Sequence, residues 1–488
     1  MGIYSTSPEI EVRERRLHSI ISYNGTAKDL YEQSRSRSLL HTERSYSQCS
    51  ACAEGCTSVV THIRDCAVVF HAPIGCDAGM FNNALVSKGT AKSRKQEEFS
   101  LNMLSSNILE KDTIFGAADK LRAAIREADQ RFHPKAMFVT TSCASGIIGE
   151  DIESVVNEME EALGYPIAPI YCEGFKSRIW SSGFDAAFHG VLRKLVKSPR
   201  KKQEDLVNVF NFEGMDTFTP LLSRLNLRVN YLLPLASLEQ IETISEAVCS
   251  TTICETLSMY VGAVLEEKYG VPEVKAPSPY GIDWTNQWLR AIAKLTHREE
   301  LAEQLIKEDG EKYHDEIEAL KAKLAGKKVY VISGDSFAHN LANVGKSLGL
   351  ELAGATSLHH DLHTDNPASV NTLSALIETN GDIPNFSVCN MQPYQVIKIL
   401  LRLRPDLLVC RHMGLTSLGS KIGIPAIFEG DANFSIGYEG VVKMGRRFYE
   451  ALQTKKLVEN IARHVKQPYT DWWLAEEDPF YFQVRAVS

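Results

Sequence analysis

The chain has 488 residues, of which 44% are hydrophobic, 23% charged and 8% aromatic. That composition is ordinary for a globular protein with a sizeable core, and it excludes a chain that is disordered or collagen-like throughout. Lys and Arg number 53 against 61 Asp and Glu, so the net charge is -8 and a nucleic-acid partner is not expected.

The first segment, residues 1–45, is polar and charged and has no clear periodicity. We expect it to form an extended arm or short surface helices. It lacks the apolar core of a secretory signal, and no stretch of the sequence offers the roughly 20 unbroken apolar residues of a membrane helix. We therefore expect a cytoplasmic protein without a membrane partner.

From residue 46 onward, short apolar runs alternate with helical patterns. Each run is rich in β-branched residues and ends in a turn before the next helix. Continuous apolar strands of this kind are typical of parallel sheets covered on both faces, so the sequence predicts an α/β, doubly wound fold. The strand-like runs are 67–70, 136–140, 207–212, 328–332 and 406–410.

Two breaks divide this alternation of strands and helices. Residues 197–205 form a polar stretch with a proline, typical of a linker, and the charged helical segment Glu299–Leu324 ends just before a new strand. We predict three Rossmann-like domains, each a parallel sheet covered by helices. They span residues 46–200, 201–326 and 327–460, and residues 461–488 form a tail.

The chain has 11 cysteines, and their distribution is uneven. Disulfides are disfavoured in the cytoplasm, which leaves metal ligation or buried thiols as the interpretations. A random scatter would not place five of them between positions 49 and 76. These five are Cys49, Cys52, Cys56, Cys66 and Cys76.

Cys76 and Cys143 each follow a predicted buried strand, at the edge where parallel sheets bind ligands. Neighbouring glycines allow a close approach of the backbone, and the start of a helix favours an anionic partner. An iron–sulfur cluster bound by thiolates is such a partner, so we interpret both residues as ligands. For Cys249, Cys389 and Cys410 we expect the commoner outcome, a buried thiol.

Five motifs in the same order resemble the component 1 proteins of the nitrogenase superfamily, and their α-type subunit in particular. The resemblance extends over roughly residues 45–455, and no single motif decides it. The motifs are Cys52, His71–Cys76, Thr141–Asp151, Cys172–Phe175, and Cys254–Tyr260 followed by Glu266–Gly270.

The resemblance implies that Cys52, Cys76 and Cys143 bind an iron–sulfur relay cluster, either an eight-iron P-cluster or a four-iron cluster. In the family this cluster is shared with a β-type subunit, so we expect an α2β2 heterotetramer. Cys56 is close enough to Cys52 to take its place, and both assignments stay open. The chain has no phosphate-binding loop of the Walker type, so we expect ATP hydrolysis in a separate Fe protein homodimer that supplies electrons.

The resemblance also implies that Cys254 holds a complex iron–sulfur cofactor of the nitrogenase type, whose heterometal the sequence does not identify. Nitrogenases add a histidine ligand from a loop that corresponds to residues 425–438, and this loop contains no histidine. We expect the far end of the cofactor to face Glu429, Asp431, His360 or a non-protein ligand. For His360 and its neighbours, the alternative is a polar loop with local hydrogen bonds.

Where nitrogenases have a Gln and a His against the cofactor, this chain has Trp180 and Phe184. An aromatic wall suits a small organic substrate better than dinitrogen, whose reduction needs rapid proton delivery. We therefore find the best resemblance to nitrogenase-like reductases such as the methylthio-alkane reductases, which cleave a C–S bond. The alternatives are a scaffold for maturation of the nitrogenase cofactor and a true nitrogenase α subunit. The Cys172–Phe175 stretch favours a catalytic subunit over the scaffold.

Overall fold

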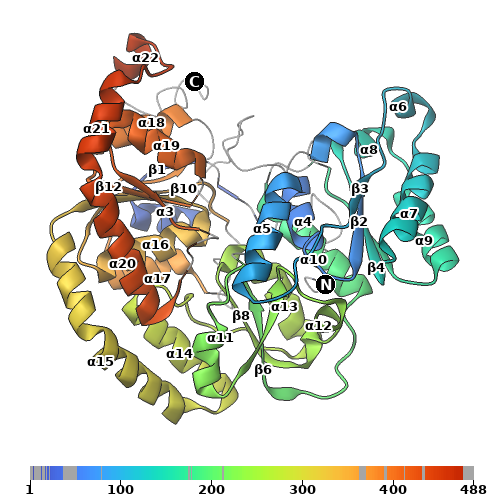
Figure 1. Cartoon of the computed structure of the whole chain (residues 1–488), viewed down its shortest axis with the longest axis horizontal. Helices are drawn as coiled ribbons and strands as arrows, with labels where there is room; N and C mark the ends of the chain where they lie inside the picture. Colours follow the sequence, from blue (N-terminus) through green and yellow to red (C-terminus); the bar gives the residue numbers. More distant parts are fainter. Residues whose placement is uncertain are drawn as a thin grey trace. The chain divides into compact units, whose positions relative to one another are not determined.

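The fold is described from a computed structural model of the chain (Figure 1). The chain divides into two compact units. Unit 1 comprises residues 1–17, 50–274 and 294–298, and unit 2 comprises residues 18–49, 275–293 and 299–488. The residues that the structure describes are 4, 13, 17, 19–20, 22–36, 52–77, 80–173, 176, 179–211, 214–361, 370–389, 393–411, 413–430, 433 and 435–475.

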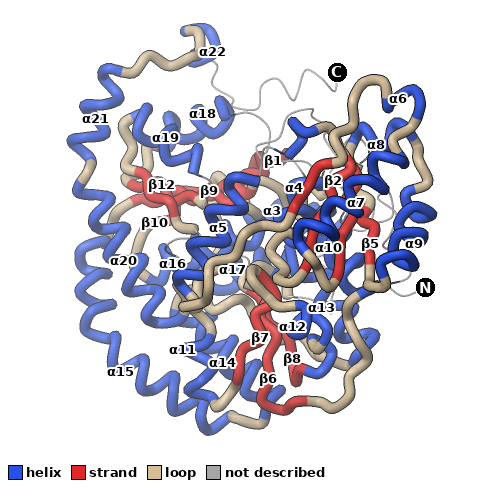
Figure 2. Tube along the Cα trace, turned by 45° about the vertical axis from the view of Figure 1, so that its right-hand side comes forward, coloured by secondary structure: helices blue, strands red, loops and turns tan. Residues whose placement is uncertain are grey.

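The first sheet of unit 1 has four parallel strands in the order β3-β2-β4-β5. All six residues of β2 and of β4 are buried, as expected for strands covered on both faces. Helices α7 and α9 cover one face, and α4 and α10 pack together on the other (Figures 1 and 2). The strands are β2 (Cys66–His71), β3 (Met103–Ser105), β4 (Ala136–Thr141) and β5 (Ile167–Ile170), and the helices are α4 (Cys52–Val60), η1 (Ile74–Asp77), α5 (Met80–Ser93), α6 (Asp112–Phe115), α7 (Ala118–Phe132), α8 (Cys143–Ile148), α9 (Ile152–Leu163) and α10 (Ser181–Lys194).

The second sheet of unit 1 has three parallel strands in the order β7-β6-β8. Helix α13 follows β8 and also packs against α10, so α10 contacts both α4 and α13. The elements are β6 (Gln203–Phe210), α11 (Thr219–Leu222), η2 (Ser223–Leu225), β7 (Arg228–Leu233), α12 (Leu238–Glu242), η3 (Ile244–Glu246), β8 (Ala247–Thr252) and α13 (Glu255–Tyr269).

Unit 2 is built on a six-stranded sheet in the order β1-β11-β10-β9-β12-β13. All its strands are parallel except β1, which pairs antiparallel with β11 at the edge. A buried apolar cluster that includes Tyr330, Ile332, Leu400 and Leu408 forms part of its core. The elements are β1 (Ser22–Gly25), α3 (Ala27–Ser36), α14 (Ile282–Thr296), α15 (Glu299–Leu324), β9 (Lys328–Ser333), α16 (Asp335–Ser347), β10 (Glu351–Ser357), α17 (Thr372–Asn380), β11 (Phe386–Cys389), α18 (Pro393–Leu403), β12 (Leu407–Cys410), α19 (Met413–Ile422), β13 (Ala426–Phe428), α20 (Gly437–Gln453), α21 (Lys455–His464) and α22 (Asp471–Ala475).

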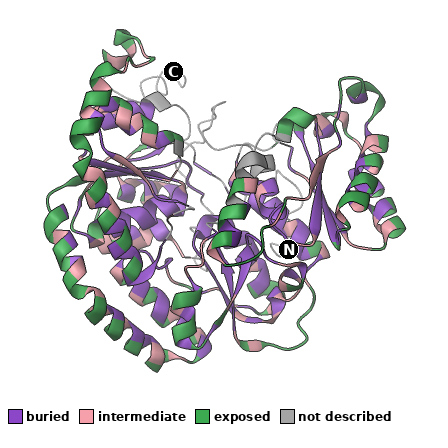
Figure 3. Cartoon of the chain, viewed as in Figure 1, coloured by how far each residue is buried: buried purple, intermediate pink, exposed green. Residues whose placement is uncertain are grey.

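The predicted α/β fold with parallel sheets covered by helices is confirmed. In the N-terminal segment, for which we expected an extended arm or short surface helices, β1 extends the sheet of unit 2 as an edge strand and α3 packs beside it. Tyr23, Ala27 and Leu30 are buried there. Three apolar residues are too few to produce a periodic pattern in the sequence that would predict a buried strand or helix. Burial follows the sheets and the inward faces of their helices (Figure 3). Among the described residues, no helix is long and apolar enough to cross a membrane.

Candidate metal-cluster sites

Two of the predicted relay cysteines come together at one edge of the first sheet. Cys76 lies in η1 directly after β2, and Cys143 is the first residue of α8 directly after β4. Strands β2 and β4 are neighbours, with His71 opposite Thr141 at their carboxyl ends. Both thiols are exposed. Cys52 begins α4, and its side chain lies outside the described residues.

A buried hydrogen-bond network fixes the two cysteine-bearing segments to each other. The Ser142 hydroxyl donates to the carbonyl oxygen of His71 at 2.8 Å, and Ser142 and Ser145 form a capping box at the start of α8. The His71 ring contacts Ser106 Oγ at 2.8 Å through Nδ1 and Glu150 Oε2 at 2.9 Å through Nε2. Burial lowers the pKa of His71, and Glu150 opposes this only in part. Both residues lie within the motifs, but nothing in the sequence pattern predicts that they pair.

Large apolar side chains are exposed on the cysteine-bearing segments η1 and α8 and on helix α6, which packs against α8. Ile74 in η1, Ile114 and Phe115 in α6, and Ile147 in α8 are 70%, 75%, 85% and 71% exposed. Helices α6 and α8 pack against each other, so three of these side chains belong to adjoining elements. Exposed apolar residues that gather on one surface mark a protein–protein contact. We refer to Ile74, Ile114, Phe115 and Ile147 as the apolar patch.

The remaining described cysteines are buried. Cys56 is fully buried in α4, in contrast to the exposed Cys76 and Cys143, and the choice between Cys52 and Cys56 as the third ligand stays a prediction. Burial raises the pKa of Cys66, Cys249 and Cys410 to about 12, so these thiols stay protonated and are poor ligands. The side chain of Cys389 lies outside the described residues.

Cys254 lies beside the second sheet, in the turn between β8 and α13. It is buried, with 3% of its surface exposed, and is the N-cap residue of the 15-residue helix α13. Its backbone is fixed on both sides: its N–H donates to Thr252 Oγ1 at 3.0 Å, and its carbonyl oxygen accepts from Ser258 Oγ at 3.1 Å. The positive end of the helix field favours a thiolate at this position.

Trp180 and Phe184 form an edge-to-face pair at the start of α10, with ring centroids 4.8 Å apart. Phe184 is buried and Trp180 half-buried. Gly55 of α4 lies against both of them. The pair follows the Cys172–Glu173 segment at the end of β5 and lies within unit 1.

In unit 2, His360 is part of a buried His/Asp cluster that the sequence did not predict in full. His360 Nδ1 lies 3.3 Å from Asp335 Oδ1, and His359 Nδ1 lies 3.1 Å from Asp361 Oδ2. Burial opposes ionisation of Asp335, but His360 and the other histidines hold the pKa of that carboxyl well below its usual range. His363, His412 and Asp431 lie outside the described residues.

Glu429, the other predicted residue near the cofactor, forms a two-pronged ion pair with Arg447. Its two carboxylate oxygens accept from the guanidinium at 2.7 and 2.6 Å. Burial raises the pKa of Glu429, and Arg447 opposes this. Both oxygens are therefore engaged by the guanidinium of Arg447. The assignment of Glu429 stays a prediction.

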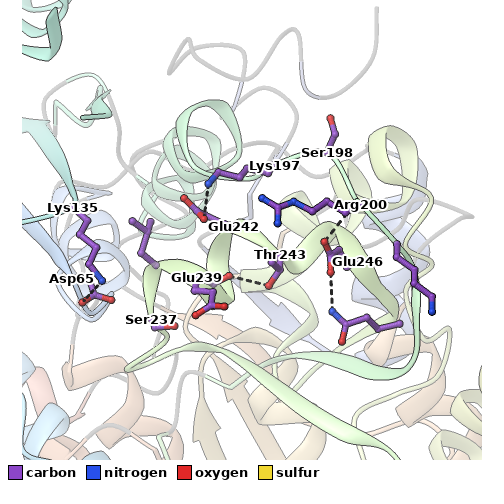
Figure 4. A pocket seen from close by; sticks show the side chains of 13 residues that line it. Asp65, Lys135, Lys197, Ser198, Arg200, Ser237, Glu239, Glu242, Thr243 and Glu246 are labelled. Carbon is purple, nitrogen blue, oxygen red and sulfur yellow. Dashed lines mark hydrogen bonds and ion pairs between the residues drawn. The ribbon is translucent and has the colours of Figure 1, made fainter. Parts of the chain in front are cut away.

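A cavity of about 780 Å³ lies in unit 1 at the other end of the strands, among segments that precede β2, β4, β6 and β8 (Figure 4). Its charges largely neutralise each other: Lys197 pairs with Glu242 at 2.7 Å and Lys135 with Asp65 at 3.4 Å. No Cys or His lines it, so this cavity is not a cluster site. Among the described residues, no group of three or more Cys, His, Asp or Glu is preformed as a metal site.

Comparison with known proteins relates the chain to one family. The family described as nitrogenase component 1 type oxidoreductase matches residues 51–453. The nitrogenase molybdenum-iron protein alpha chain of Methanosarcina barkeri is 30% identical over 373 residues, which are 72% of this chain and 68% of the relative. The cofactor biosynthesis protein NifE of Methanococcus maripaludis is 27% identical over 413 residues, 82% of each chain. A solved structure of nitrogenase Cp1 at pH 5 superposes with a TM-score of 0.71 at 22% identity, over 88% of this chain and 93% of the other.

Proposed function

The chain belongs to the nitrogenase component 1 type oxidoreductases, and we propose that it is the catalytic α-type subunit of a nitrogenase-like reductase that cleaves the C–S bond of methylthio-alkanes. The observation that carries this proposal is the edge-to-face pair of Trp180 and Phe184 at the start of α10. The two positions correspond to a Gln and a His in nitrogenases. Aromatic rings there give an apolar wall, which binds a small thioether by its hydrocarbon groups.

The donor residues fit two separate clusters within unit 1. Cys76 and Cys143 are exposed thiols at one sheet edge, and with Cys52 they would hold the relay cluster. Cys254 is a buried thiol at the start of α13, beside a different sheet, and would hold the cofactor. When bound, such clusters supply stored electrons at low potential, which amino-acid side chains do not provide. The protein's own part is to orient the thiolates and to exclude water around Cys254.

The apolar patch supports a partner chain at the relay cysteines. An exposed thiol pair leaves a cluster open on one side, and a β-type subunit that covers the patch would complete its coordination. This agrees with the α2β2 heterotetramer that the family resemblance implies. We further propose that electrons arrive from a separate, ATP-hydrolysing Fe protein.

A scaffold for cofactor maturation is the second candidate. It is supported by the similarity to NifE, which extends over 82% of both chains. A scaffold would hold the cofactor precursor at Cys254 but would not turn over a substrate. A dinitrogen-reducing α subunit is the third candidate.

One experiment separates the three candidates. The complex is purified without oxygen and supplied with an Fe protein, ATP and either ethyl methyl sulfide or dinitrogen. Methanethiol together with ethane supports the reductase, ammonia supports a true nitrogenase, and the absence of both supports the scaffold. Full activity with dithionite alone, without the Fe protein, would contradict the proposed electron donor.

A further inference from the structure

The N-terminal segment contributes a buried arginine to unit 1. Of residues 1–17, which belong to this unit, the structure describes Tyr4, Arg13 and Leu17. Arg13 is only 1% exposed, and Leu17 is fully buried. A charged guanidinium is costly to bury unless its N–H groups are hydrogen-bonded, so a position this deep requires specific partners.

Two acceptors of Arg13 lie at the two ends of one short stretch of chain. Its Nη2 donates to the carbonyl oxygen of Tyr171, directly after β5, at 3.0 Å. Its Nε donates to Ser182 Oγ, in the first turn of α10, at 3.2 Å. The guanidinium therefore joins the end of β5 to the start of α10 across residues 172–181. The planar fork of an arginine suits two acceptors in different directions, whereas a lysine offers a single nitrogen.

Ser182 lies between the two members of the aromatic pair on α10. It comes two residues after Trp180 and two before Phe184, and it is fully buried. The same turn also packs on α4, where Gly55 approaches the Trp180 carbonyl oxygen and the ring of Phe184. The first turn of α10 is thus held by packing from α4 and by the hydrogen bond from Arg13.

Tyr4 gives the N-terminal segment a second contact with α10. Its ring lies against His189 of this helix, with the ring centroids 5.3 Å apart. Nζ of Lys268, in the last turn of α13, lies 4.1 Å from the centroid of the Tyr4 ring. The segment therefore contacts the helix of the aromatic pair at two points, and it also contacts the helix that is capped by Cys254.

We propose that Arg13 is a positioning residue, which holds the start of α10 so that Trp180 and Phe184 keep one arrangement toward the substrate. The proposal rests on the proposed reductase function for the role of the aromatic pair. It adds that a residue more than 160 positions earlier in the chain sets the affinity for the substrate. Arg13 acts through Ser182 and not by contact with the substrate.

The first test measures hydrogen exchange of the backbone amides of residues 179–185 in the complete complex. Arg13→Met keeps an apolar stem but removes both hydrogen bonds. Exchange in this stretch should become at least roughly 10-fold faster, the scale of one lost hydrogen bond to a charged group. Exchange in β2 should stay at the wild-type rate, because the change is local.

Ser182→Ala tests the same hydrogen bond from the other side. It should speed exchange at residues 179–185 in the same direction, and the double variant should add little to Arg13→Met, because both changes remove one shared interaction. The matched control is Arg131→Lys in α7. This arginine is exposed and pairs with Glu127, so its variant should match the wild type in every measurement.

The second test measures turnover of ethyl methyl sulfide with the Fe protein and ATP. Arg13→Met should raise KM by up to roughly 10-fold, the size expected when one contact of an apolar pocket is lost. The kcat should stay near the wild-type value, because the loss concerns binding of the substrate and not the reaction step. A wild-type KM in both Arg13→Met and Arg13→Lys would overturn the proposal.

Three further results would overturn it. They are wild-type exchange at residues 179–185 in Arg13→Met, an equal acceleration in β2, which assigns the arginine a general structural role, and fully additive effects of the Arg13 and Ser182 changes. If Arg13→Met does not assemble, Ser182→Ala alone carries the exchange and KM comparisons. A wild type that reduces no thioether overturns the proposed function, while exchange at residues 179–185 still decides whether Arg13 holds the start of α10.

Discussion

Gly55 of α4 lies so close to Trp180 that a Cβ atom at position 55 would come within 2.7 Å of the Trp180 carbonyl oxygen. That oxygen accepts a hydrogen bond from Gly183 N in the first turn of α10. The same Cβ would lie 3.3 Å from the ring of Phe184. The helix that begins at Cys52 therefore rests directly on the backbone that positions the aromatic pair. The backbone of Gly55 is helical, so the glycine is required by the close approach of α10 and not by an unusual backbone conformation.

Gly55→Ala should destabilise the protein by about 1–3 kcal/mol, the usual cost of forcing extra atoms into a packed site. The matched control is Gly89→Ala in α5, where a Cβ would meet nothing within 4 Å. There the same change should stabilise the helix by roughly 0.5–1 kcal/mol, because alanine loses less backbone entropy on folding. Urea unfolding of both variants measures the difference. Equal effects at the two positions would contradict the close packing of α4 on α10.

Cys76→Ala should remove iron from the relay site and weaken the complex with the β-type subunit. A cluster that bridges two chains contributes to their association, so its loss lowers the affinity of the partners. Iron analysis and gel filtration of the anaerobically purified protein provide the measurement. The control is Cys66→Ala, ten residues earlier in β2, which removes a buried, protonated thiol and should keep the iron. Unchanged iron in the Cys76 variant would refute the assignment.

The pH dependence of stability should include a contribution from His189. Burial, with the positive charges of Arg193, Arg13 and Lys268, lowers the pKa of His189 to about 4. The unfolded residue binds a proton near pH 6.5, so between about pH 6.5 and 4 the unfolded state carries more protons than the folded one. Stability should therefore fall as the pH falls through this window.

His189→Gln should flatten that decline, because the glutamine side chain does not titrate. The control is His133→Asn, a change at an exposed residue with left-handed backbone that asparagine also adopts. Denaturant midpoints measured at pH 7, 6, 5 and 4 compare the slopes. An unchanged slope in the His189 variant would show that another group dominates the pH response.

The sequence predicted the parts of the site that depend on local pattern. The runs at 67–70 and 136–140 are apolar and β-branched, and both form fully buried strands that end beside Cys76 and Cys143. Parallel pairing of adjacent strands then brings the two cysteines to one edge. Cys249 and Cys410 stand apart from the other cysteines in the sequence, and both are buried thiols as expected.

Other contacts could not be predicted because they join residues that are far apart in the sequence, and they depend on how the elements pack and where the side chains point. Strand β1 pairs with β11 more than 350 residues later, and no local signal in the polar N-terminal segment indicates that partner. The ion pair of Glu429 with Arg447 depends on how α20 turns back from β13. The close approach of Gly55 to Trp180 depends on helix packing, for which a single glycine in a helix is only a weak signal.

Cys254→Ala should abolish turnover and release the cofactor while the relay cluster stays bound. The two sites follow different sheets of unit 1, and the backbone of Cys254 is hydrogen-bonded to Thr252 and Ser258. Metal analysis should show a partial loss of iron, and the spectroscopic signal of the relay cluster should persist. Complete loss of iron would instead mean that the two sites depend on each other.

Phe184→His should weaken thioether reduction, because it replaces part of an apolar wall with a polar ring. Phe184 is buried, and its edge-to-face contact with Trp180 at 4.8 Å is lost or altered when the ring changes. Aromatic pairs of this kind contribute about 0.5–1.5 kcal/mol beyond their buried area, so the substrate wall should also become less ordered. For a substrate held by hydrocarbon contacts, kcat/KM should fall roughly 10-fold, in the range seen when one small group changes in an apolar pocket.

The measurement is methanethiol release from ethyl methyl sulfide by the complete complex, with Phe188→Tyr on the next turn of α10 as the control. Phe188 packs against Phe210 of β6 instead of Trp180, so its change should affect stability more than substrate use. A Phe184→His variant with unchanged kcat/KM would mean that the aromatic pair does not contact the substrate, and the reductase proposal would lose the observation on which it depends.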